Sequence, residues 1–414
     1  MEKITNKEEQ ILVGISGLDQ PGLTATVMRI LARYNAQILD IGQANIHSTL
    51  SLGILIRIDV DKSGQVMKEL LFKATELGVN IDFRPITDND YDDWVHHQGK
   101  NRYILMVVGR SLSAAQIALV TRIIQQQGFN IDNIRRLTGR MSIKHPERNL
   151  RTCFEFSLRG EPINREQMQG EFMKLSQEHE IEISFQEDTM YRRMRRLICF
   201  DMDSTLIQAE CIDELARRHG VYDQVAAITA SAMRGEIDFK ESFTRRVALL
   251  KGLDVSVMDD IAKNLPITEG CDRLMKVLKK AGYKIAILSG GFTYFGEYFR
   301  KTYGVDYVYA NELEIGEDGK LTGHYVGPVV DGLRKAELLK LIAQVEHINM
   351  QQTVAIGDGA NDLPMITEAG LGIAFHAKPK VVANAPQTIN SIGLDAILYF
   401  LGFKDSYLGE DGVA

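Results

Sequence analysis

The chain has 414 residues, of which 45% are hydrophobic and 25% charged, and its formal net charge is -7. This length exceeds what one hydrophobic core usually supports, so we expect about two to four domains. A negative net charge gives no general affinity for nucleic acid or anionic membranes, so neither is expected as a partner. The charged N-terminus and the absence of about 18 consecutive apolar residues predict a cytoplasmic protein.

Two similar segments make up the first half of the chain. The hydrophobic pattern of 1–87 predicts strands and helices in the order βαββαβ, and 102–190 repeats that order. The polar stretch 88–101 between them predicts a linker. The corresponding positions are Gly17 with Gly109 and Ile38 with Ile131. Their nearly constant spacing indicates an internal duplication.

A D-x-P-G turn, with Asp19, Pro21 and Gly22, leads into the first predicted helix. On this turn and the element order, both copies resemble ACT domains, small ferredoxin-like modules that bind amino acids at paired interfaces and regulate metabolic enzymes. The resemblance implies a homodimer and an amino-acid effector whose carboxylate meets backbone N–H groups at the helix N-terminus. The second copy has residues 110–113 (Arg-Ser-Leu-Ser) in place of the turn, so we expect it to be structural. A dimerisation or packing platform without a ligand stays open for the whole half.

The second half, 191–414, has short apolar strands, each followed by a polar or glycine-rich loop and a helix. The clearest strands are 197–200, 284–288 and 353–356. This alternation predicts an α/β fold with a doubly wound, mostly parallel, Rossmann-like sheet, whose site lies beyond the carboxyl ends of the strands. The charged helical segment at about 211–265 is too long for a simple crossover and predicts an inserted helical cap.

Four groups of polar residues follow these strands or begin a helix. Any one of them is also typical of an ordinary turn or surface. Together they supply carboxylates for a hard cation, backbone N–H groups for a phosphate and a lysine as a point charge. They are Asp201 and Asp203 in D-x-D-S-T, Ser289 and Gly290 in S-G-G, Lys335, and Asp358, Asn361 and Asp362 in G-D-G-x-N-D.

In this order the four groups resemble the haloacid dehalogenase superfamily of phosphohydrolases. The resemblance implies that Asp201 forms an aspartyl-phosphate, while Asp203 protonates the leaving alkoxide and then activates water. It implies that Mg²⁺ is bound by Asp201, the backbone carbonyl of Asp203 and Asp358, supported by Asp362. The groups implied to hold the phosphoryl oxygens are Ser289, Gly290, Asn361 and Lys335.

Four residues of the predicted cap bear on the substrate: Glu210, Met233, Phe239 and Arg246. Spacing alone favours ordinary positions for them in helix caps, surface and core. However, segments 200–216 and 239–250 resemble phosphoserine phosphatases, and the N-terminal half resembles their ACT-containing bacterial form. This implies that Glu210 and Arg246 hold the amino and carboxylate groups of O-phospho-L-serine, with Met233 and Phe239 lining the pocket. The implied activity is the last step of serine biosynthesis.

Three alternatives remain open. The phosphoryl group could pass to another amino-acid alcohol such as homoserine instead of to water, and phosphate release without an added acceptor would distinguish hydrolysis from this transfer. The substrate could be a different small phosphomonoester, which would not depend on Arg246. A third alternative, from another class of protein, is an amino-acid sensor with a vestigial catalytic half, and Mg²⁺-dependent phosphate release would exclude it.

Overall fold

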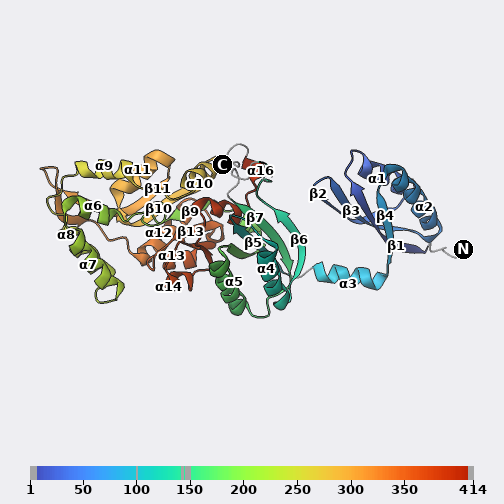
Figure 1. Cartoon of the computed structure of the whole chain (residues 1–414), viewed down its shortest axis with the longest axis horizontal. Coiled ribbons are helices and arrows are strands. Elements are labelled where there is room, and N and C mark those ends of the chain that lie inside the picture. The colour runs from blue at the N-terminus through green and yellow to red at the C-terminus, as the bar shows by residue number, and fades with distance from the viewer. Residues whose placement is uncertain (1–6, 99–100, 141–143, 145–150, 409–414) are drawn as a thin grey trace. The chain divides into compact units, whose positions relative to one another are not determined.

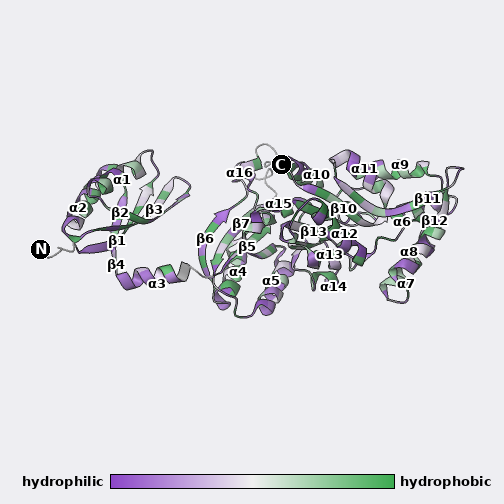
Figure 2. Cartoon of the chain, turned by 180° about the vertical axis from the view of Figure 1, so that it is seen from behind, coloured by the Kyte–Doolittle hydropathy of each residue, from purple (hydrophilic) through white to green (hydrophobic). Residues whose placement is uncertain are grey.

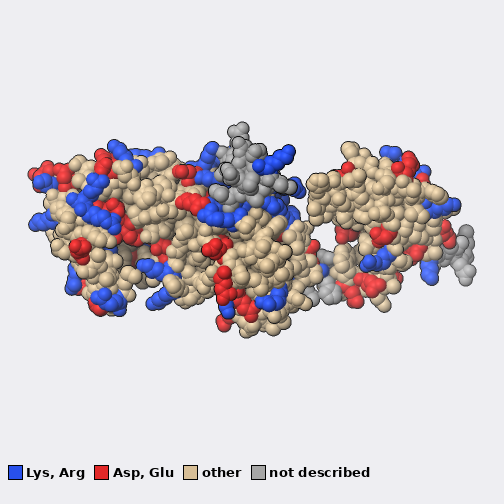
Figure 3. Space-filling view, in the orientation of Figure 1, with Lys and Arg blue, Asp and Glu red and all other residues tan. Residues whose placement is uncertain are grey.

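The computed structural model describes residues 7–98, 101–140, 144 and 151–408. The chain divides into two compact units, Met1–Lys100 and Asn101–Ala414. Within the described residues, no helix is both long and apolar enough to span a membrane. On the face shown in Figure 3, basic and acidic side chains are interspersed.

The first unit contains a four-stranded antiparallel sheet with two helices on one face (Figure 1). Its elements are β1 (Glu8–Leu18), α1 (Leu23–Arg33), β2 (Gln37–Ile46), β3 (Thr49–Asp59), α2 (Val60–Leu77) and β4 (Asn80–Ile86). The strands pair in the order β2-β3-β1-β4. Alternate residues of β1, such as Val13 and Ile15, are buried against Val27 of α1 and Val66 of α2, which follows from the two-residue period of a strand. The expected βαββαβ order is confirmed.

The second unit begins with the other βαββαβ copy. Its elements are β5 (Arg102–Gly109), α4 (Ala114–Gln126), β6 (Asn130–Arg136), β7 (Thr152–Arg159), α5 (Arg165–His179) and β8 (Glu182–Glu187). The strand order β6-β7-β5-β8 repeats that of the first copy. Both copies also have a register shift at corresponding places, between Ile38 and Asp40 and between Ile131 and Asn133. Strand pairing does not require a bulge there, so its recurrence supports the duplication.

A seven-stranded sheet forms the centre of the second unit. In spatial order its strands are β12 (Leu321–Val326), β11 (Tyr307–Ile315), β10 (Lys284–Phe292), β9 (Leu197–Phe200), β13 (Thr353–Gly357), β14 (Leu371–Phe375) and β15 (Gln387–Ile389). Neighbours are parallel except for β11 and β12. The expected mostly parallel sheet is therefore confirmed, and β9, which carries the D-x-D motif, lies between β10 and β13.

Helices cover both faces of this sheet. Ile198 and Phe200 of β9 join the core formed with α10 (Cys271–Lys280) and α11 (Thr293–Tyr303), whereas Leu197 and Cys199 join the core formed with α12 (Gly332–Val345) and α13 (Leu363–Glu368). Burial on both faces explains why β9 is continuously apolar.

The cap lies between β9 and α10. It consists of α6 (Cys211–His219), α7 (Tyr222–Met233), α8 (Phe239–Ala248) and α9 (Ser256–Asn264). The remaining short helices are η2 (Met190–Arg193), η3 (Met350–Gln352), α14 (Pro379–Val382), η4 (Leu394–Ala396), α15 (Ile397–Phe400) and α16 (Asp405–Leu408).

The segment expected to be a linker contains a helix, α3 (Asp88–Gln98), coloured mainly as hydrophilic in Figure 2. The Thr87 hydroxyl accepts from the N–H of Asp90 at 3.1 Å and donates to its carboxylate at 2.7 Å. This reciprocal capping stabilises the start of a polar helix. Tyr91 and Trp94 of α3 line a cavity of about 340 Å³ together with Leu12 of the first sheet.

The second copy shares its hydrophobic core with the central sheet. Ile104, Met106 and Val108 of β5, on the face opposite its own helices, belong to the same buried cluster as Leu398 and Phe400 of α15. The edge strands β8 and β15 are also joined. The side-chain amide of Gln387 on β15 accepts from the N–H of Phe185 at 3.1 Å and donates to its carbonyl at 2.9 Å. The second copy is thus packed firmly against the α/β domain.

Candidate active site

The two acids of the D-x-D motif are buried at the carboxyl end of the central strand. The N–H of Asp201 donates to the carbonyl of Ile356 on β13 at 2.8 Å, which holds this loop against the neighbouring strand. A carboxylate oxygen of Asp201 accepts from the N–H of Met202 at 2.7 Å. Ser204 then adopts a φ of 56°, a left-handed conformation that turns the chain towards the cap. The loop geometry therefore fixes the positions of both Asp201 and Asp203.

The S-G-G segment, 289–291, lies beside these acids. The sequence predicted a loop after the strand, but the structure places the segment within β10, where pairing with β11 is interrupted between Leu288 and Phe292. The Ser289 hydroxyl accepts from the N–H of Gly291 at 3.0 Å. A Cβ atom on Gly291 would lie 2.5 Å from a carboxylate oxygen of Asp203. Glycine is therefore required for the backbone to approach this acid so closely.

Asn311 on β11, which sequence reasoning missed, fixes the S-G-G segment. Its side-chain amide is buried, donates to the carbonyl of Gly290 at 2.8 Å and accepts from the N–H of Val330 at 2.8 Å. Val330 lies just before α12, which carries Lys335, so one asparagine joins two of the candidate phosphate-binding elements. No local motif distinguishes this asparagine, and the sequence analysis did not identify its strand.

Lys335 is fully buried beneath the D-x-D loop. Its Nζ lies 3.0 Å from an oxygen of Asp201 and 2.6 Å from an oxygen of Asp362. Burial alone would lower the pKa of Lys335, but the two carboxylates outweigh it and the pKa is raised. The lysine is therefore held as a cation. The second carboxylate oxygen of Asp362 accepts from the N–H of Gly359 at 2.9 Å.

Asp201, Asp358 and Asp362 form a compact carboxylate cluster, each offering an oxygen within 4.8 Å of the others. Burial, followed by the charge of Asp201, raises the pKa of Asp358 to about 8. One lysine does not neutralise three carboxylates, so a hard divalent cation with oxygen ligands fits this cluster. Because both oxygens of Asp362 already have hydrogen-bond partners, Asp201 and Asp358 are the better placed ligands.

Asp203 differs from its neighbour in environment. Burial, and next the negative charge of Glu210, raise the pKa of Asp203 to about 8. The N–H of Cys211, the first residue of the cap, donates to its carboxylate at 3.3 Å. A carboxyl group that holds a proton near neutral pH is suited to general acid and base chemistry.

The four cap residues lie at two depths. Glu210, Phe239 and Arg246 line a cavity of about 150 Å³ together with both acids of the D-x-D motif. Glu210 also accepts from the Ser204 hydroxyl at 2.7 Å. Met233 is 65% exposed and lines a wider outer cleft of about 910 Å³. Two opposite charges, Glu210 and Arg246, thus line the same cavity as the acids, whereas Met233 lines only the wider cleft, which Glu210 and Arg246 also reach.

The remaining predicted residues also meet at this cavity. Its lining includes Ser289, Gly290, Asp358 and Asn361. Lys335 contacts Asp201 from below, and Asp362 contacts Lys335. Sequence reasoning missed Lys378, an exposed residue that lines both the cavity and the outer cleft. It follows β14, so the convergence of loops after parallel strands was the signal that could have identified it.

Two family models match the chain. Residues 198–367 match the model of haloacid dehalogenase-like hydrolases, and residues 9–84 match the ACT domain. The central sheet, the cap and the carboxylate cluster are those of a haloacid dehalogenase-like hydrolase, a class of metal-dependent enzymes.

Relatives that match nearly the whole chain indicate which family within this class it belongs to. Phosphoserine phosphatase SerB2 of Mycobacterium tuberculosis is 37% identical over 393 residues, covering 95% of this chain and 93% of that protein. The phosphoserine phosphatase of Streptomyces coelicolor is 38% identical over 409 residues, covering 96% and 93%. The structure of a probable phosphoserine phosphatase from Vibrio cholerae superimposes with a TM-score of 0.58 at 34% identity, covering 72% of this chain and 86% of that one. The chain belongs to the phosphoserine phosphatase family.

Proposed function

We propose that the protein hydrolyses O-phospho-L-serine to L-serine and phosphate through an aspartyl-phosphate on Asp201. The observation that carries this proposal is the single small cavity in which the D-x-D acids face Glu210 and Arg246. A phosphate ester bearing an ammonium and a carboxylate group is complementary to that arrangement. The carboxylate of Glu210 suits the ammonium group, and the guanidinium of Arg246 suits the carboxylate.

The two acids have separate roles in this proposal. A carboxylate oxygen of Asp201 attacks phosphorus, and the bond from phosphorus to the serine oxygen breaks. Asp203, whose pKa is raised, gives its proton to that oxygen, then takes a proton from the water that hydrolyses the aspartyl-phosphate. Lys335 and backbone N–H groups of the S-G-G segment balance the charge of the phosphoryl oxygens, and Ser289 and Asn361 add hydrogen bonds.

We further propose Mg²⁺ as the metal. Asp201, the backbone carbonyl of Asp203 and Asp358 would hold it, with Asp362 supporting them through its bonds to Lys335 and Gly359. When bound, the ion would supply a positive charge that allows an anionic carboxylate to approach an anionic phosphate.

The first ACT copy is our candidate effector site. Gly22 begins α1 in a left-handed conformation, with φ 89°, and no side chain caps this helix. In the second copy, the Ser113 hydroxyl and the side chain of Gln116 form a capping box at the start of α4, so that end already has internal partners. An amino acid bound at the first copy is therefore the proposed effector. Homodimer formation and a cytoplasmic location stay predictions.

The test measures phosphate release from a panel of phosphorylated amino acids with Mg²⁺, with EDTA, and with L-serine added. We expect release from L-phosphoserine without an added acceptor alcohol, and loss of release with EDTA. Asp201→Asn should abolish turnover while preserving the circular dichroism spectrum. Full activity of Asp201→Asn, or equal rates across the panel, would contradict the proposal.

A further inference from the structure

The cap is joined to the α/β domain through a short two-stranded base. The N–H of Gln208 donates to the carbonyl of Pro266 at 2.8 Å, and the N–H of Thr268 donates to that of Leu206 at 3.0 Å. An antiparallel bridge links the residues between them, Ile207 and Ile267. The entering chain continues directly to Glu210 and the start of α6. The position of this base therefore sets where Glu210 stands over the cavity.

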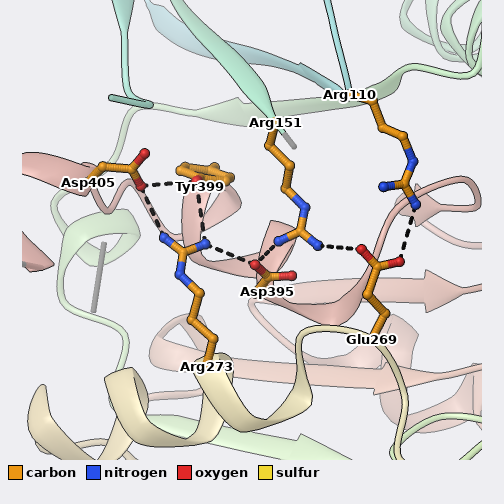
Figure 4. Close-up of polar contacts among 7 residues, drawn as sticks. All are labelled: Arg110, Arg151, Glu269, Arg273, Asp395, Tyr399 and Asp405. Carbon is orange, nitrogen blue, oxygen red and sulfur yellow. Dashed lines mark hydrogen bonds and ion pairs between the residues drawn. The ribbon is translucent and has the colours of Figure 1, made fainter. Parts of the chain in front are cut away.

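Glu269, one residue beyond this base, is held by the second βαββαβ copy (Figure 4). Arg110, which follows β5, lies 3.2 Å from one carboxylate oxygen of Glu269, and Arg151, which precedes β7, lies 3.0 Å from the other. The carbonyl of Glu269 also accepts from the N–H of Leu394 at 2.8 Å. A Cβ atom on Gly393 would lie 2.5 Å from that carbonyl oxygen, so Glu269 is docked closely against η4.

Arg151 also belongs to a buried ionic network that anchors it. Arg151 pairs with Asp395 of η4, and Asp395 also lies 2.9 Å from Arg273 of α10. Arg273 lies 3.1 Å from Asp405, whose other oxygen accepts from the N–H of Gly139 in the second copy at 2.7 Å. Arg151, Asp395 and Asp405 are at most 8% exposed. A side chain that is held by several fixed partners has few accessible conformations. Arg151 is therefore a rigid support for Glu269.

We propose that Arg110 and Arg151 of the second copy are positioning residues for the phosphatase reaction, acting through Glu269 on the base of the cap. By holding Glu269 from two sides, they fix the paired segments 206–208 and 266–268, and thereby Glu210. The second copy then contributes to substrate selection without contacting the substrate. This inference rests on the proposed function, since Glu210 is assigned there to the substrate ammonium group.

The test uses Arg110→Gln, Glu269→Gln and the double variant, because both side chains are about half exposed and tolerate replacement. Arg165→Gln is the matched control: its pair with Glu187, 3.2 Å long and similarly exposed, lies wholly within the second copy. The measurements are KM and kcat for L-phosphoserine, the inhibition constant of inorganic phosphate, and the melting temperature. Inorganic phosphate lacks the groups assigned to Glu210 and Arg246, so it reports on the phosphoryl-binding residues alone.

We expect KM for L-phosphoserine to rise about two- to five-fold in each single variant, which corresponds to the interaction free energy of a partly exposed ion pair. The double variant should show no more than the larger single effect, because both changes break the same contact. Phosphate inhibition, melting temperature and the Arg165→Gln control should stay at wild-type values. An unchanged KM in Glu269→Gln would overturn the inference, as would a KM that rises together with the phosphate inhibition constant. Absence of L-phosphoserine hydrolysis by the wild type would instead refute the proposed function, and this inference with it.

Discussion

Replacing Lys335 with methionine tests the charge distribution beneath the D-x-D loop. The lysine is fully buried and lies 3.0 Å from Asp201 and 2.6 Å from Asp362. Methionine has a similar length and no charge, so the replacement removes both ion pairs without leaving a large cavity. The carboxylates of Asp201 and Asp362, both buried, then lose the cation that contacts them.

The expected loss of stability follows from that burial. Breaking a buried ion pair by removing one partner costs about 3–5 kcal/mol, since the remaining charge is desolvated and unpaired. In a domain of this size, about 2 °C of melting temperature is lost per kcal/mol, so we expect a decrease of about 6–10 °C without metal. Catalysis should fall about 10²- to 10³-fold, the range for removal of one preorganised electrostatic contact to a transition state.

Two further variants separate these effects. Lys335→Met with Asp362→Asn removes the stranded carboxylate and should recover much of the melting temperature but none of the activity. Lys340→Met, on the same helix and paired with Glu368 at the surface at 2.9 Å, should change neither. The assays are differential scanning fluorimetry and phosphate release from L-phosphoserine. Activity of Lys335→Met within about tenfold of wild type would refute the reasoning.

Three other variants test separate parts of the structure. Gly291→Ala would place a methyl group 2.5 Å from Asp203 and should lower kcat about 100-fold at unchanged melting temperature, whereas Gly64→Ala, with open space around it, should keep full activity. Arg246→Ala should raise KM for L-phosphoserine at least about tenfold without changing inhibition by inorganic phosphate, and an unchanged KM would contradict its assignment to the carboxylate. Burial raises the pKa of Glu182 above its usual 4.5, so ionisation as the pH rises disfavours the folded state. The unfolding free energy of Glu182→Gln minus that of the wild type, both measured in urea, should therefore increase as the pH rises from 4.5. A difference that stays constant with pH would argue against this.

The grouping of the candidate site residues could be predicted from the sequence because most of them follow a simple rule. Asp201 and Asp358 directly follow the apolar strands β9 and β13, and Ser289 lies in the carboxyl-terminal half of β10. Parallel strands bring such ends to one edge of the sheet. Lys335 was identified from its place at a helix start together with the family resemblance. The roles given to these residues stay proposals that the variants above test.

Other features could not be read from local patterns. Asn311 acts only because β11 runs beside β10, and that pairing has no signature in the sequence around it. Helix α3 did have a signal, the capping pair of Thr87 and Asp90, but the polar composition of the segment favoured a linker. The contacts of Arg110 and Arg151 with Glu269 join residues more than 100 positions apart, so their charges were indistinguishable from ordinary surface charges.

The shared core of the second copy bears on how such a chain can change during evolution. The first copy forms a compact unit with a hydrophobic core made of its own residues, so it could be removed or exchanged as a whole. Loss of the second copy would instead uncover the apolar residues of α15 that now pack against Ile104, Met106 and Val108. Several of those residues would have to become polar at once for the shortened chain to remain folded. We therefore expect the duplicated modules to have been under different selection, the first replaceable as a whole and the second inherited together with the hydrolase.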